Sequence, residues 1–300
     1  METKKVFFAF GKAVETKESA PIKKYIGIAP VQIVAINPNK EELEKLFNRT
    51  IDKEPEYLGV REIEGQKIPF IRVDFFLKTN PDKSNGIDTI AKLSLFVRQD
   101  KMTNKDNTKY KVIDKYARNA WVTVEEYNNN LIPQYSNGPA RIDKNYRQMF
   151  RGEEQIISFV KTFLGINDVD EYVDGVWKMR SNPEDYEAGF NNINNWFKGD
   201  ISEIKDSIKL MPNNYIKVMF GVRAGDDGRE YQDIFTECFA KGNSNSTKGF
   251  EKTLKEAKER GAYSNTEFEV CELKEYNPNP TNLNNPVDSD DLPFSENPWA

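Results

Sequence analysis

The order of the strand-like segments limits what this chain can fold into. Residues 68–78, Ile-Pro-Phe-Ile-Arg-Val-Asp-Phe-Phe-Leu-Lys, and residues 87–98 both have the composition of strands, and the turn-rich residues 80–86 join them. Such a short connection allows an antiparallel pair only, because parallel strands need a long crossover. Strand-like segments cluster instead of alternating with helical ones. We therefore predict an α+β protein with a mostly antiparallel β core.

The rest of the sequence predicts the other strands and helices. Asn39 precedes a short amphipathic segment, 40–47, and is placed to cap a helix there. Pro30 interrupts the strand-like run 25–37, which indicates a strand pair or a bent strand at a sheet edge or a bulge. Further strands are expected at 6–10, 110–116, 120–124, 215–223 paired with 230–239, and 266–274, and further helices at 153–164, 181–187, 200–210 and 248–260.

Composition favours a globular protein inside a cell. With 300 residues, 38% of them hydrophobic, the chain is long enough to bury a core. No apolar run approaches the roughly 18 residues that a membrane span needs, so we expect no membrane partner. Cys238 and Cys271 lie in apolar runs and are expected to be buried free thiols.

The chain contains no histidine. This excludes zinc sites of the Cys/His kind, Ser-His-Asp triads and histidine general bases. Carboxylate-held metal and lysine chemistry stay possible on this ground alone. We expect a protein that is not an enzyme and that needs neither a metal nor another cofactor.

Positive charge is concentrated in one fifth of an acidic chain. Residues 92–151 contain twelve basic and six acidic residues, a net charge of +6, whereas the whole chain carries −5 and the remainder therefore −11. A basic segment of this kind is the electrostatic footprint of a protein that binds a phosphate backbone.

Aromatic residues lie among these charges. Basic side chains that follow phosphates, together with exposed rings that stack on bases, hold single strands without sequence preference. The alternative is that the rings belong to the core and the lysines to a solvated rim. The predicted DNA-binding residues are Lys92, Phe96, Arg98, Lys109, Tyr110, Lys111, Lys115, Tyr116, Arg118, Trp121, Tyr135, Arg141, Lys144, Tyr146 and Arg147.

The last segment, 277–300, has a composition unlike the rest. It contains four acidic residues, no basic residue and five prolines, so neither a helix nor a strand is expected to persist in it. We predict a single body at 1–276 and a disordered acidic C-terminal tail with a hydrophobic tip at 277–300. An ordinary frayed terminus is the alternative. The predicted partner-binding residues of the tail are Asp288, Asp290, Asp291, Leu292, Pro293, Phe294 and Trp299.

Several blocks of the chain are similar to segments of known protein families. The tail motif Asp290-Asp-Leu-Pro-Phe294 is similar to the C-terminal tip of bacterial and phage single-stranded DNA-binding proteins. In that family the Phe ends the chain, whereas here Ser-Glu-Asn-Pro-Trp-Ala300 follows it. Nearly the whole chain resembles the single-stranded DNA-binding proteins of crAss-like gut phages. The blocks are Tyr25-Ile-Gly-Ile-Ala-Pro30, Val112-Ile-Asp-Lys-Tyr-Ala-Arg-Asn-Ala-Trp-Val122, Ser136-Asn-Gly-Pro-Ala-Arg-Ile-Asp-Lys-Asn-Tyr-Arg147, Phe220-Gly-Val-Arg223, Asp227-Gly-Arg229 and Asn297-Pro-Trp-Ala300.

The resemblance implies an OB-like barrel, elaborated with helices, that binds single-stranded DNA in phage replication and recombination. It also implies that the tail recruits replication proteins and competes with DNA for the basic groove. The expected location is then the cytoplasm of the infected host cell, or the virion if the protein is packaged; the oligomeric state stays open.

Two other functions are alternatives. A virion-packaged or structural phage protein fits the composition equally well. A metal-dependent nuclease would need Asp233 together with Glu272 and Lys274, the latter two being an acidic-x-Lys triplet that is common by chance in charged proteins.

Overall fold

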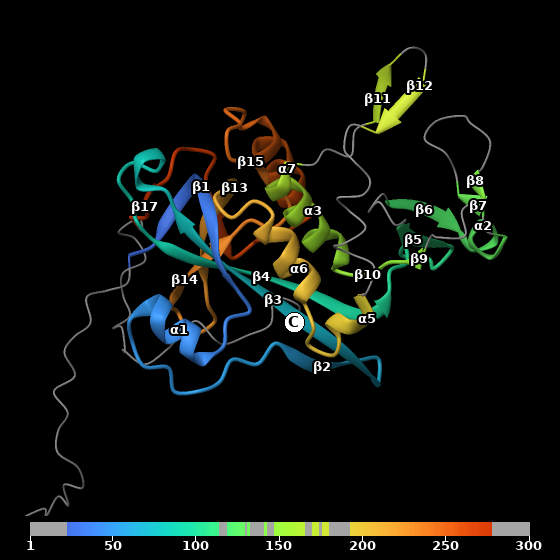
Figure 1. Ribbon diagram of the computed structural model, residues 1–300, viewed down its shortest axis with the longest axis horizontal. Coiled ribbons are helices and arrows are strands. Elements are labelled where there is room, and N and C mark those ends of the chain that lie inside the picture. Colours follow the sequence, from blue (N-terminus) through green and yellow to red (C-terminus); the bar gives the residue numbers. More distant parts are fainter. Residues whose placement is uncertain are drawn as a thin grey trace, which may run out of the picture.

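A curled antiparallel sheet forms the centre of the molecule (Figure 1). The computed structural model describes residues 23–113, 119–129, 131–132, 141–142, 147–165, 170–173, 176–179 and 193–277. The main path of the sheet has the order β10 (Phe150–Arg151), β4 (Ile90–Lys101), β3 (Gln66–Thr79), β1 (Tyr25–Ile36), β13 (Ile216–Ala224) and β14 (Glu230–Ile234). The sheet curls into a half-barrel, so that β14 lies beside β4 without being its hydrogen-bonded neighbour. The prediction of a mostly antiparallel α+β fold is confirmed.

Short strands extend this sheet and others form small sheets of their own. In the main sheet, β2 (Leu58–Ile63) pairs with β3, β15 (Ala240–Lys241) and β16 (Thr266–Phe268) pair with β13, and β17 (Lys274–Glu275) pairs with β1. The small sheets join β5 (Lys109–Ile113) to β6 (Asn119–Thr123) and β9 (Arg147–Gln148), β7 (Leu131–Ile132) to β8 (Arg141–Ile142), and β11 (Asp170–Val173) to β12 (Val176–Met179).

Helices pack on both sides of the sheet. The α-helices are α1 (Lys40–Phe47), α2 (Val124–Asn128), α3 (Glu153–Leu164), α5 (Ile193–Trp196), α6 (Ser202–Lys209) and α7 (Lys248–Glu259), and a 3-10 turn, η1, spans Pro81–Lys83. As predicted, Asn39 caps α1 in a capping box with Glu42. Among the described helices, none has the length and apolarity that crossing a membrane would require.

The main core lies on the inner face of the curled sheet. Every second residue of β3 from Ile71 to Leu77 and of β4 from Ala91 to Val97 belongs to it, as the period of a strand requires. The helices α3, α5 and α6 supply the opposing side chains, and the rings of Phe75 and Phe159 lie 4.6 Å apart. The outer face of β3 and β4 is thereby left for polar and aromatic residues.

Pro30 lies in an internal strand, so the edge that its position suggested is wrong. The sheet accepts the proline because β1 changes neighbours at this point. Gly27 to Val31 pair with β13, whereas pairing with β3 starts only at Val31. The predicted bend is present, because the register with β3 shifts between Ile33 and Ala35.

Most predicted elements within the described residues are present, with shifted ends. The expected strand at 266–274 is broken into β16 and β17, and the one at 230–239 ends at Ile234. Strand β2 was not predicted. The expected strand at 6–10, the expected helix at 181–187 and the tail at 278–300 lie outside the described residues.

Gly152 joins the sheet to α3 where no side chain fits. Its φ angle is 89°, and a Cβ atom there would lie 1.9 Å from the carbonyl oxygen of Phe96. Gly65 has a similar φ of 78°, but a Cβ atom there would have no neighbour within 4 Å.

We expect Gly152→Ala to lower the free energy of unfolding by about 2–4 kcal/mol, because the clash with the backbone of β4 adds to the strain of positive φ. Gly65→Ala, which carries the strain alone, should cost about 1 kcal/mol. Urea unfolding of both variants measures the difference. Equal losses would mean that the close approach of Gly152 to Phe96 contributes nothing.

Candidate nucleic-acid interface

Rings and guanidinium groups alternate on the outer face of β3 and β4. The register places Phe70 opposite Arg98 and Arg72 opposite Phe96, so that the four side chains form a two-by-two pattern. The rings of Phe70 and Phe96 are 6.0 Å apart and tilted by 54°. The Phe70 ring lies over Gly59 of β2, where a Cβ atom would come within 2.5 Å of it. We call these four residues, together with Tyr57 and Lys92, the outer-face patch.

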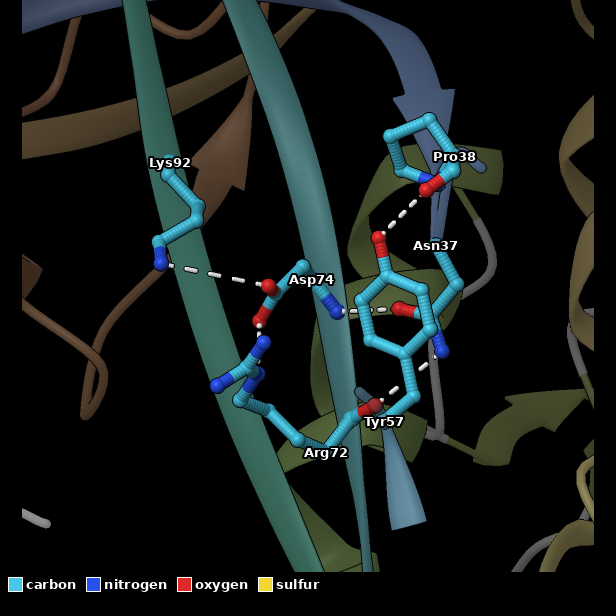
Figure 2. A network of polar contacts seen from close by, with 6 residues as sticks. All are labelled: Asn37, Pro38, Tyr57, Arg72, Asp74 and Lys92. Atoms are coloured by element: carbon cyan, nitrogen blue, oxygen red, sulfur yellow. Dashed lines mark hydrogen bonds and ion pairs between the residues drawn. The ribbon is translucent and has the colours of Figure 1, made fainter. Parts of the chain in front are cut away.

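A buried carboxylate holds the cations of this patch (Figure 2). Asp74 is 1% exposed, and its two oxygens lie 3.1 Å from Arg72 Nε and 3.9 Å from Lys92 Nζ. The Arg72 guanidinium also lies over the ring of Tyr57, 5.6 Å from its centre. One negative charge is thus shared by two positive ones, so the group of Arg72, Asp74 and Lys92 carries a net positive charge.

Asn37 ties the end of β1 to this network (Figure 2). Its backbone N–H donates to the carbonyl of Asp74 at 3.0 Å, its Nδ2 donates to the carbonyl of Arg72 at 3.0 Å, and its Oδ1 accepts the N–H of Asp74 at 2.6 Å. Asn37 has a φ of 41°, a conformation that asparagine tolerates better than most residues. The hydroxyl of Tyr57 donates to the carbonyl of Pro38 at 2.6 Å. These bonds fix the backbone from which Arg72 and Tyr57 project.

Burial shifts the pKa of two patch residues. The pKa of Lys92 is lowered, chiefly by burial; Asp74 opposes this shift and Arg72 adds to it. The pKa of the Tyr57 hydroxyl is raised, first by burial and then by the negative charge of Asp74. Tyr57 therefore acts as a neutral ring and hydrogen-bond donor at neutral pH.

A second shared carboxylate lies beside Arg98. Asp100 Oδ2 lies 2.9 Å from Arg98 Nη2 and 3.1 Å from Arg151 Nε of β10, the strand that pairs with β4 there. Again two cations share one anion. At the opposite end of the same face, α1 covers Phe76 and Ile90 with Leu43 and other apolar side chains, so the open part of the face is the end that carries Phe70 and Phe96.

The β5–β6 hairpin carries the second group of predicted residues. Lys109 and Trp121 are exposed, the latter to 38%. Lys111 is 9% exposed, with its Nζ 3.3 Å from Glu154 and 5.2 Å from the centre of the Trp121 ring. Tyr110 packs against Tyr127 with the ring centres 5.4 Å apart, beside Val112 and Val122. Tyr110 is therefore part of a small core, and Trp121 is the exposed ring of the hairpin.

Arg147 holds α3 in place. Its guanidinium forms two hydrogen bonds to Glu153, a fully buried carboxylate that also accepts the N–H of Phe150 at 3.0 Å. Both Arg147 and Lys111 thus bind carboxylates at the start of α3, and these ion pairs fasten the hairpin region to the main core.

The other predicted residues cannot be placed at the patch. Arg141 belongs to β8, for which only the backbone is described. The following lie outside the described residues: Lys115, Tyr116, Arg118, Tyr135, Lys144 and Tyr146, and in the tail Asp288, Asp290, Asp291, Leu292, Pro293, Phe294 and Trp299.

Sequence reasoning missed Tyr57, Phe70 and Arg72. All three precede the basic segment 92–151 from which the predicted residues were chosen. A signal was available for two of them, because Phe70, Arg72 and Asp74 alternate with apolar residues along one predicted strand.

The residues of the alternative nuclease site have different neighbours in the structure. Asp233 of β14 pairs with Gly221, and burial raises its pKa. Lys274 forms an ion pair with Glu269, and Glu272 bridges to Ile28. Within the part of the chain that is described, no group of three or more Cys, Asp or Glu side chains could hold a metal ion.

In comparisons with known proteins, no family model, no curated protein and no solved structure matches this chain.

We expect Asp74→Asn to lower the free energy of unfolding by about 1–3 kcal/mol, because Arg72 and Lys92 lose their shared counter-charge while remaining near each other. Asp206→Asn is the control, since it breaks an exposed pair with Lys209 and should change stability by less than about 0.5 kcal/mol. Denaturant unfolding measures both. If Asp74→Asn were as stable as the wild type, the shared carboxylate would not support the patch.

Proposed function

We propose that the protein binds single-stranded DNA without sequence preference, using the outer-face patch of β3 and β4. The observation that carries this proposal is the two-by-two pattern of Phe70, Arg98, Arg72 and Phe96. Rings stack on bases of any sequence, and guanidinium groups bind phosphates. A face that presents both, with more cations than carboxylates, suits an unpaired strand better than a duplex, whose bases are not open to stacking.

The strand order supports an OB-like barrel. Strands β1, β3 and β4 follow one another as a meander, and β13 returns to the other side of β1 and brings β14 with it. Helices α3, α5 and α6 fill the connection between β4 and β13, and β14 closes toward β4. In OB-folds, oligonucleotides bind on the face of the second and third strands. Here those positions belong to β3 and β4, which carry the patch.

The rest of the functional proposal depends on the sequence. The resemblance to phage proteins favours a role in phage replication or recombination in the cytoplasm of an infected cell. The acidic composition of 277–300 favours a segment that recruits replication proteins and competes with DNA for the patch.

We expect Phe96→Leu to weaken binding to oligo-dT by about 5- to 150-fold, which corresponds to the 1–3 kcal/mol of one lost stacking interaction. Leucine keeps apolar volume, so the fold should persist. Phe47→Leu is the control, because it removes a ring of a similar pair, 5.8 Å from Phe76, at the last residue of α1 and at the opposite end of the face.

Fluorescence titrations of each protein with oligo-dT, at about 50 mM and 200 mM salt, measure the affinities. The wild type should bind more weakly at the higher salt. Wild-type protein that fails to bind oligo-dT at the lower salt would refute the function. Equal affinities of Phe96→Leu and Phe47→Leu would refute the site.

Trp121 allows the hairpin to be tested separately. Because its ring is exposed and lies outside the hydrophobic clusters, Trp121→Ala should leave the thermal unfolding temperature nearly unchanged. If the ring stacks on a base, binding to oligo-dT should weaken by about 1–3 kcal/mol. Anisotropy of labelled oligo-dT measures binding in the variant. A large loss of thermal stability would instead assign Trp121 to the core.

A further inference from the structure

Within the described part of the chain, strand β2 leaves one edge of the main sheet without a neighbouring strand. Among the described strands it pairs with β3 alone. The N–H of Arg72 donates to the carbonyl of Tyr57, and hydrogen-bonded pairs alternate in an antiparallel ladder. The backbone groups of Leu58, Val60 and Glu62 therefore point away from β3. Such an edge is a template for another strand.

The two halves of this edge differ. Arg61 and Glu62 place charges at its C-terminal half, which is how proteins commonly discourage strand addition. The N-terminal half, Leu58-Gly59-Val60, carries no charge, and its two apolar side chains are 45% and 60% exposed. Leu58 and Val60 lie on the same face, since they are two residues apart.

We propose that β2 pairs with β2 of a second copy of this chain, antiparallel, about a two-fold axis at Gly59. If the two-fold axis is perpendicular to the sheet, both copies turn the same face to the same side. Residues that lie opposite each other then share a face, so their numbers are both odd or both even. Centring on Gly59 places each Leu58 opposite Val60 of the other copy.

The Gly59 register also places Glu62 opposite Glu56 of the other copy, but Glu56 precedes the first residue of β2, and the neighbouring registers lose the apolar pair of Leu58 and Val60. Centring on Val60 places Leu58 opposite Glu62, and centring on Arg61 places two arginines opposite each other.

The same register joins the two outer-face patches. Phe70 lies over Gly59 in each copy, so the two Phe70 rings meet on the outer face beside the axis. Arg61 lies on that face too, opposite Ile68, and comes opposite Tyr57 of the other copy. The dimer thus presents one continuous row of rings and cations in place of two separate patches. The pairing itself involves no DNA.

Sedimentation velocity of the full-length protein without DNA tests the interface. We expect the wild type to form dimers as its concentration rises to about 100 μM, and Val60→Lys to weaken dimerisation at least about tenfold. Leu210→Lys is the matched control, because it charges another exposed leucine, at the end of α6, and should dimerise like the wild type. A wild type that stays monomeric, or a Val60→Lys variant that dimerises normally, would overturn the proposal.

Disulfide trapping tests the register. Opposite residues of a hydrogen-bonded pair have Cα atoms about 5.5 Å apart, within disulfide reach. A chain with both Leu58→Cys and Val60→Cys should form a disulfide between residue 58 of one copy and residue 60 of the other, and peptide mapping locates it. The wild type, which contains only Cys238 and Cys271, gives the background level of cross-linking. Val60→Cys alone should not exceed this background. Efficient 60–60 cross-linking, or none in the double variant, would refute the Gly59 axis. Because both assays lack DNA, they can fail while the DNA-binding proposal stands.

Discussion

The ion pairs of Asp74 are the interaction on which the outer face of the sheet depends. A carboxylate that is 1% exposed would be costly without partners, since burying a charge requires compensation. Arg72 and Lys92 supply this compensation from two neighbouring strands, and Asn37 forms hydrogen bonds with the backbone of Arg72 and Asp74 in β3. One residue thereby orders the end of β1, the middle of β3 and the middle of β4. The cations are thus held in place within the fold, and under the proposed function this preorganisation would reduce the entropy that binding DNA costs.

Local patterns predicted much of the fold, and long-range pairing decided what they missed. The meander of 68–78 and 87–98, the cap at Asn39 and the helix at 153–164 follow from composition and period alone. Strand β2 was not predicted because Gly59, Arg61 and Glu62 interrupt its β-forming residues. It forms because Leu58–Ile63 pairs with β3. Pro30 misled for a related reason. Its effect depends on which neighbour pairs at that residue, and sequence does not state where β1 changes partners.

The candidate site overlaps in part with the residues selected from the sequence, and charge counting explains both the overlap and the difference. Lys92, Phe96 and Arg98 were selected from the basic segment and lie on the open face. Lys111 and Arg147 were selected in the same way, yet they bind Glu154 and Glu153. All four cations bind carboxylates, so a count of charges along the chain cannot tell a cation that holds a helix from one that lies on the outer face of the sheet. Phe70 and Arg72 were missed because they enter the site through pairing with β4, outside the counted window.

The shared carboxylates also explain how an acidic chain can present a positive face. Asp74 and Asp100 each lie beside two cations, so each cluster is rigid and still carries a positive charge. If every cation had its own carboxylate, the face would be neutral; without carboxylates, neighbouring cations would repel one another and lose their orientation. The net charge of −5 is therefore no argument against binding a phosphate backbone. What matters is the local ratio of cations to anions beside the Phe70 and Phe96 rings, and a second copy joined at Gly59 would double that local surplus without changing the ratio.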